Sequence, residues 1–168
     1  MAEDRIDELQ SSLRALRRQL DQLDRRQQAS ASGLRQAVLA ATVAGAMLVL
    51  TATTWRTAPG DGASVGDLGS LWGMTSDGWQ PVAALVLVVA TALGSLAVFL
   101  GEAGRVGHVV LVVLALLTAL AILLVGGVEP DGWYESEDYE SAAGRWLTLL
   151  AALGLAALHG GRASELRR

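Results

Sequence analysis

Glu102, Arg105, His108 and His159 are the residues whose types could do chemistry, because each lies beside an end of an uncharged apolar run. Imidazoles and a carboxylate that converge could bind a metal ion or move a proton. Their spacing matches no recurring metal motif, however, and polar residues are also expected wherever a helix end meets water. We therefore predict no metal site and no cofactor. Glu102 and His108 are the residues that an enzyme working at the membrane interface would use.

A second group of possible ligands lies in residues 129–140, which are rich in acids and contain no base. Such a loop could collect Ca²⁺, but it lacks the regular ligand positions and central glycine of a calcium-binding loop. We predict a solvated loop instead. The chain contains no cysteine, and no Ser/His/acid set is apparent at membrane depth, so no catalytic residue is predicted.

Long apolar runs must position these residues, since 52% of the chain is hydrophobic and the charges gather between four blocks. Residues 37–55, 81–101 and 109–128 are uncharged, and about 20 residues suffice for a helix to cross about 30 Å of hydrocarbon. Backbone groups in lipid must bond within their own segment, so these runs predict helices despite their many valines. A weaker fourth span is predicted at 142–160, with Arg145 reaching up to the headgroups.

Arginine placement supports four spans and orients them. All 13 basic residues are Arg. Only Arg56 and Arg145 fall in the two loops on one side of a four-span chain, and the basic excess marks the cytoplasmic side. Three spans would leave the basic tail, "GRASELRR", on the opposite side. We predict an all-α integral membrane protein of two helical hairpins with both termini cytoplasmic. The Arg-, Ala- and Gly-rich composition favours a bacterial plasma membrane.

Five tryptophans fall at the outer boundary of this topology, and two of them follow Asp-Gly turns. Tryptophan prefers the headgroup level, where its ring is buried and its N–H stays hydrated. The predicted interface anchors are Trp55, Trp72, Trp79, Trp133 and Trp146.

The first 33 residues form a separate arm and hinge in this prediction, before a membrane domain of residues 34–168. Apolar residues recur in steps of three and four, which is the a/d pattern of a coiled coil. This arm seam consists of Ile6, Leu9, Leu13, Leu16, Leu20 and Leu23. Ser and Ala residues around Gly33 predict the hinge. The same amphipathic arm could instead lie on the inner membrane surface with its arginines near anionic lipid.

Small residues recur every fourth position in the predicted spans, a spacing that lets helix backbones approach closely. The longest such packing stripe consists of Gly144, Thr148, Ala152, Ala156 and Gly160. Shorter steps occur at Ala37, Ala41 and Gly45 and at Ala90 and Gly94, where an alanine-rich composition could produce them by chance.

These features favour a non-enzymatic membrane scaffold, assembly subunit or regulatory subunit whose arm binds a second copy or a protein partner. A small oligomeric transporter or pore is an alternative, although the runs at 37–55, 81–101 and 109–128 lack the mid-depth carboxylate or histidine of a proton-coupled carrier. The enzyme at the membrane interface is a third. A net charge of −4 gives no sign of nucleic-acid binding. The sequence itself names no partner, solute or process.

Overall fold

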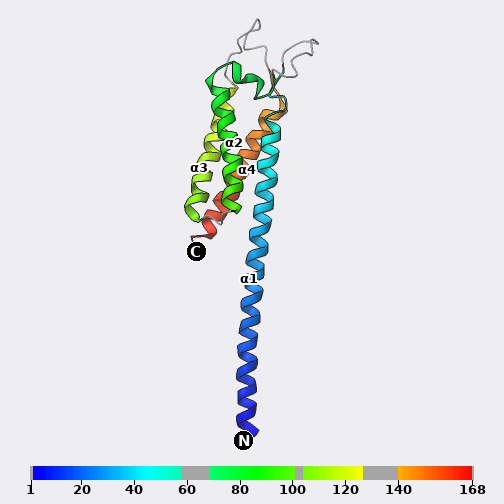
Figure 1. Ribbon diagram of the computed structural model, residues 1–168, viewed down its shortest axis with the longest axis vertical. Coiled ribbons are helices and arrows are strands. Elements are labelled where there is room, and N and C mark those ends of the chain that lie inside the picture. The colour runs from blue at the N-terminus through cyan, green and yellow to red at the C-terminus, as the bar shows by residue number, and fades with distance from the viewer. Residues whose placement is uncertain (1, 58–68, 101–103, 127–139, 168) are drawn as a thin grey trace. The chain divides into compact units, whose positions relative to one another are not determined.

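The computed structural model describes residues 2–57, 69–100, 104–126 and 140–167. The protein is mostly helical (Figure 1). Its long helices are α1 (Ala2–Leu50), α2 (Trp79–Leu100), α3 (Arg105–Val125) and α4 (Ala143–Glu165). A short 3₁₀ helix, η1 (Gly73–Ser76), precedes α2. Two short strands, β1 (Arg56–Thr57) and β2 (Glu140–Ser141), pair antiparallel.

Within these described ranges, three helical segments are long and apolar enough to cross a membrane: Gly33–Leu50, Trp79–Phe99 and Arg105–Val125. They indicate a membrane-embedded protein. The second and third lie within about four residues of the predicted spans 81–101 and 109–128, but α1 ends at Leu50, so residues 51–55 of the first predicted span are not helical. The predicted fourth span is not confirmed, because α4 is not among these segments. With 23 residues α4 is long enough, but Arg145, His159, Arg162 and Glu165 make it more polar than the other three.

Helix α1 divides between two compact units, Met1–Gln36 and Ala37–Arg168. In the first unit the chain is helical throughout the described residues. Residues 30–33, where the sequence predicts a hinge, are also helical. A single glycine costs a helix only about 1 kcal/mol relative to alanine, so flanking turns can carry a helix through Gly33.

The second unit packs around alanines and a smaller number of large apolar residues. Its core includes Ala44 and Met47 of α1, Val88 of α2, Ile122 of α3 and Leu155 of α4. Large leucines and valines remain on the surface of every helix, as at Val86, Leu120 and Leu150. An apolar exterior around a small-residue core is the arrangement expected of helices in lipid, where close backbone contact replaces the hydrophobic effect.

The two ends of this bundle differ in chemistry. At one end α1 and α3 finish and α2 and α4 begin, and the two strands lie there; we call it the sheet end. At the other end α2 and α4 finish and α3 begins; we call it the histidine end, because His108 lies in the first turns of α3 and His159 in the last turns of α4.

At the sheet end, Trp55 joins three separate segments. Its indole N–H donates to the Leu50 carbonyl (2.8 Å). Its backbone N–H donates to Gly69 (2.6 Å), and its carbonyl accepts from Ala142 (2.9 Å). The side chain is 0% exposed. Trp55 therefore lies inside protein rather than against headgroups, and its role differs from that of the interface anchor predicted from sequence.

Candidate functional site

Histidines from two helices meet at the histidine end. His108 Nδ1 and His159 Nδ1 are 2.9 Å apart, and the residues are 3% and 0% exposed. The contact forms because α3 begins at the end where α4 finishes, which brings positions 51 residues apart to the same level. The sequence placed these two residues only beside helix ends. Helix α3 begins at Arg105 rather than near residue 109, so His108 belongs to the helix.

Two residues of α2 complete this histidine cluster. Ser95 Oγ lies 3.0 Å from His159 Nε2, and Ser95 is 0% exposed. Phe99, one turn further along the same face of α2, packs its ring 5.3 Å from that of His108 and 5.1 Å from that of His159. Sequence reasoning missed both residues. Their only signal is the four-residue spacing, which places them on one helix face.

Hydrogen bonding in the cluster requires one proton between the two Nδ1 atoms. Either His159 donates to His108 and accepts from the Ser95 hydroxyl, or His108 donates to His159, whose Nε2–H then donates to Ser95. Both arrangements leave the two rings neutral, because a neutral imidazole has one donor and one acceptor. Three helices are thus joined by buried hydrogen bonds that both rings can make while they are neutral.

The order Ser95, His159, His108 resembles a nucleophile, its base and a residue that orients the base. Burial argues against hydrolysis. Ser95 Oγ lies inside a packed helix interface, where a substrate carbonyl cannot reach it. Its backbone N–H lies within helix α2, whereas an oxyanion hole needs N–H groups free to point at the substrate.

Of the other two residues considered from sequence, Arg105 is exposed, and Glu102 lies outside the described residues. Within the part of the chain that the structure describes, no group of three His, Cys, Asp or Glu side chains could hold a metal ion. Of the acidic run at 129–140, only Glu140 is described, in strand β2.

Two arginines cap helix α3 at the sheet end. Arg145 donates from Nε to Ile122 O (3.2 Å) and from Nη2 to Leu123 O (2.9 Å). Arg56 donates from Nη2 to Val125 O (3.0 Å). The last four carbonyls of a helix lack intrahelical partners, and its C-terminus carries partial negative charge. Since α3 has no basic residue in its last turn, Arg56 and Arg145 supply both hydrogen bonds and charge.

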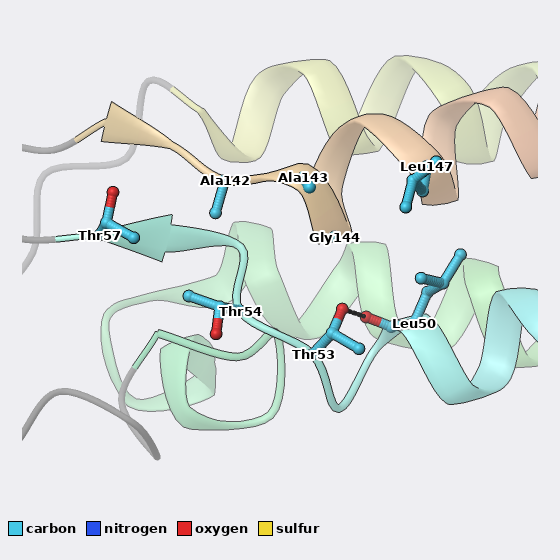
Figure 2. A pocket seen from close by; sticks show the side chains of 8 residues that line it. All are labelled: Leu50, Thr53, Thr54, Thr57, Ala142, Ala143, Gly144 and Leu147. Atoms are coloured by element: carbon cyan, nitrogen blue, oxygen red, sulfur yellow. Dashed lines mark hydrogen bonds between the residues drawn. The ribbon is translucent and has the colours of Figure 1, made fainter.

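A cavity of about 420 Å³ lies between the end of α1 and the start of α4. Figure 2 shows Leu50 and Leu147 on its helical side, with Thr53 and Thr54 nearby. The Thr53 hydroxyl already donates to the Leu50 carbonyl (2.7 Å). The eight lining residues include no charged side chain, so this cavity offers no acid–base chemistry.

Gly144 borders this cavity and permits a close approach of chains. A Cβ atom there would collide with the Thr53 hydroxyl and the Thr54 carbonyl oxygen. Its N–H donates to that same carbonyl (3.2 Å). Glycine at this position is thus explained by contact with the end of α1.

The predicted packing stripe lies mostly on the buried face of α4. Gly144, Thr148, Ala152 and Ala156 are buried, and Gly160 is half-buried. His159 occupies the buried position near the end of this face, because a helix of 3.6 residues per turn drifts away from a four-residue step. Of the shorter steps, Ala41, Gly45 and Ala90 are exposed, whereas Gly94 contacts Leu111 closely.

The described side chains of the arm seam and of the other predicted anchors are exposed. Four leucines of the arm seam are 55–65% exposed, namely Leu13, Leu16, Leu20 and Leu23. Ile6 and Leu9 lie in α1, but their side chains are outside the described part. Among the predicted anchors other than Trp55, three are exposed: Trp72, Trp79 and Trp146. Trp133 is also outside the described residues.

Comparison with known proteins gives no relative: no family model, curated protein or solved structure matches this chain.

Proposed function

We propose that this protein is a non-enzymatic membrane scaffold or assembly subunit whose N-terminal arm joins two copies of the chain. The observation that carries the proposal is the row of exposed leucines on the arm. Leu13, Leu16, Leu20 and Leu23 are each more than half exposed. An uncovered leucine row at heptad spacing is the surface that a coiled coil buries.

A second copy is the occupant that the membrane favours. Two chains inserted in the same direction present their arms on the same side, so the arms are parallel before they meet. Anchorage also raises their effective concentration, which compensates for a seam of fewer than three heptads. In a parallel pair the flanking positions bring Ser12 near Arg17 and Gln19 near Asp24 of the other copy, and no like charges oppose one another.

The proposed setting is a bacterial plasma membrane, with four spans and both termini cytoplasmic. Arg56 and Arg145 are the only arginines on the predicted outer side. Their bonds to α3 carbonyls support this placement, because they give both cations a partner at the end of a span. In this setting α4 is the fourth span, and its polar His159 is shielded by α2 and α3.

Charges on the arm seam should abolish pairing. In the variant Leu13→Asp with Leu20→Asp, we expect the association constant to fall at least about tenfold, since each buried leucine contributes about 1.5–3 kcal/mol. Cross-linking of the full-length protein in liposomes measures this effect. The matched control is Ala15→Asp with Gln22→Asp, which adds the same charges at the same spacing on another face. Unchanged cross-linking in the seam variant would contradict self-association and favour an arm lying on lipid.

Topology is tested by single cysteines, since the native chain has none. We expect a cysteine at Ser76 or Ser136 to react with a membrane-impermeant thiol reagent on intact cells. A cysteine at Ser30 or Ser164 should react only after permeabilisation. Labelling at Ser164 in intact cells would show that α4 does not cross.

A further inference from the structure

The histidine cluster plays no part in the proposed pairing of the arms. We propose that His108 and His159 form a proton-operated latch, which holds the histidine end of α4 against α2 and α3 while both rings are neutral and releases it when both are protonated. The latch lies wholly within the unit Ala37–Arg168, so it is independent of the proposed pairing of the arms.

In the closed latch, the rings are held by hydrogen bonds and by close packing. The two Nδ1 atoms lie at hydrogen-bond distance (2.9 Å) and Ser95 holds the far nitrogen of His159 (3.0 Å). Phe99 packs against both rings. Beside Ser95, a Cβ on Gly94 would lie only 2.9 Å from the Leu111 side chain, so α2 and α3 are in close contact there. These contacts hold α4 against both α2 and α3.

Protonation of both rings is incompatible with this geometry. A doubly protonated imidazole carries hydrogen on both nitrogens, so two such rings would turn N–H against N–H across the Nδ1 contact. The charge would also be buried without compensation, which strongly disfavours the charged form. If one proton is added to the pair, one ring still offers an unprotonated Nδ1, so the hydrogen bond persists. If two protons are added, no Nδ1 acceptor remains.

Among the described residues, the charged groups near the cluster do not offset this repulsion; Glu102 lies outside the described part of the chain. Helix α2 places Ser95 and Phe99 against the rings. On α3, Arg105 lies three residues before His108 and is exposed. On α4, Arg162 lies one turn after His159 and carries positive charge. The nearby carboxylate of Glu165 is already paired with Arg162 at 2.9 Å.

The number of protons bound by the closed and opened states determines how pH changes the opening equilibrium. In an opened state the rings reach water and take up protons below the ordinary histidine pKa of about 6.5. The closed state holds one or two fewer protons, so falling pH favours opening. Each extra proton changes the opening equilibrium about tenfold per pH unit. The latch is therefore closed at neutral and alkaline pH and opens as the medium becomes acidic.

The chain's two histidines make a direct test possible. In full-length protein labelled with ¹⁵N only at histidine and placed in lipid nanodiscs with a metal chelator, ring nitrogen NMR observes only this pair. At about pH 8 we expect one protonated and one unprotonated Nδ1, with scalar coupling between them through the hydrogen bond. As the pH falls, the coupling should vanish at the point where the ring nitrogen shifts show a second proton on both rings. Two uncoupled Nδ1 signals at pH 8, or a second proton on both rings while the helices stay together, would overturn the latch.

Opening is measured separately by the distance between spin labels on Val106→Cys and Ser164→Cys, at exposed positions of α3 and α4. Well below pH 6.5, the ratio of separated to closed populations should rise about tenfold per pH unit for each extra proton that the open state binds. Thr91→Val, the matched control, removes a buried hydrogen bond between α2 and α3 outside the cluster but no titrating group, and should keep this pH dependence. His108→Gln with His159→Gln should lose it. A pH dependence that survives the double glutamine variant would overturn the proposal, as would labelling of Ser95 by a fluorophosphonate, which would indicate a hydrolase.

Discussion

Replacing Trp55 by alanine should lower the free energy of unfolding by about 3–5 kcal/mol, the cost of emptying a buried aromatic site. The side chain is 0% exposed, and its indole N–H satisfies the carbonyl of Leu50, the last residue of α1. Alanine would leave a cavity and would remove one hydrogen bond from that carbonyl, which also accepts from Thr53. Unfolding in mixed micelles by added SDS, followed by far-UV circular dichroism, measures the loss.

Two further tryptophan variants separate the causes. Trp55→Phe fills most of the volume but removes the donor, so we expect a loss nearer to the value of one hydrogen bond, about 1 kcal/mol. Trp79 is 73% exposed, and Trp79→Ala should cost less than about 1 kcal/mol. Equal losses for Trp55→Ala and Trp79→Ala would show that Trp55 acts at the bilayer surface, as the sequence predicts, and not as a packing residue.

Ala152→Leu should destabilise the bundle by about 1–3 kcal/mol, the usual cost of overpacking. Ala152 is 0% exposed and lies between two other buried positions of α4, Thr148 and Ala156. A leucine there must push helices apart. Lipid offers no compensating hydrophobic gain, because leucine is equally stable against acyl chains and against protein. The same SDS titration measures this effect.

The control for Ala152→Leu is Leu150→Ala, two positions away on the same helix. Leu150 is 62% exposed, so its truncation should cost less than the overpacking does. A larger loss in Leu150→Ala than in Ala152→Leu would show that the face described as exposed is covered, and that the small-residue face of α4 meets lipid.

The residues that join the helices could not be found from the sequence. His108 and His159 are separated by 51 positions, and Ser95 and His159 by 64. Whether such residues meet depends on the rotation of each helix about its axis and on its register against its neighbours. Small and apolar residues occur on every face of each span, so the sequence contains little information about the rotation or the register of a helix. Arg56 and Arg145 were identified as flanking residues, but their bonds to α3 depend on the same two quantities.

What the sequence by itself determined is local: helices over its uncharged runs, with bounds for α2 and α3 within about four residues of the prediction. This works because a backbone in lipid has no partner outside its own helix, so apolar length alone specifies the element. Tertiary structure alone decided that Trp55 is buried, that Gly144 meets the end of α1, and that two histidines share a hydrogen bond. Those outcomes are set by close packing between distant segments, which no local pattern encodes.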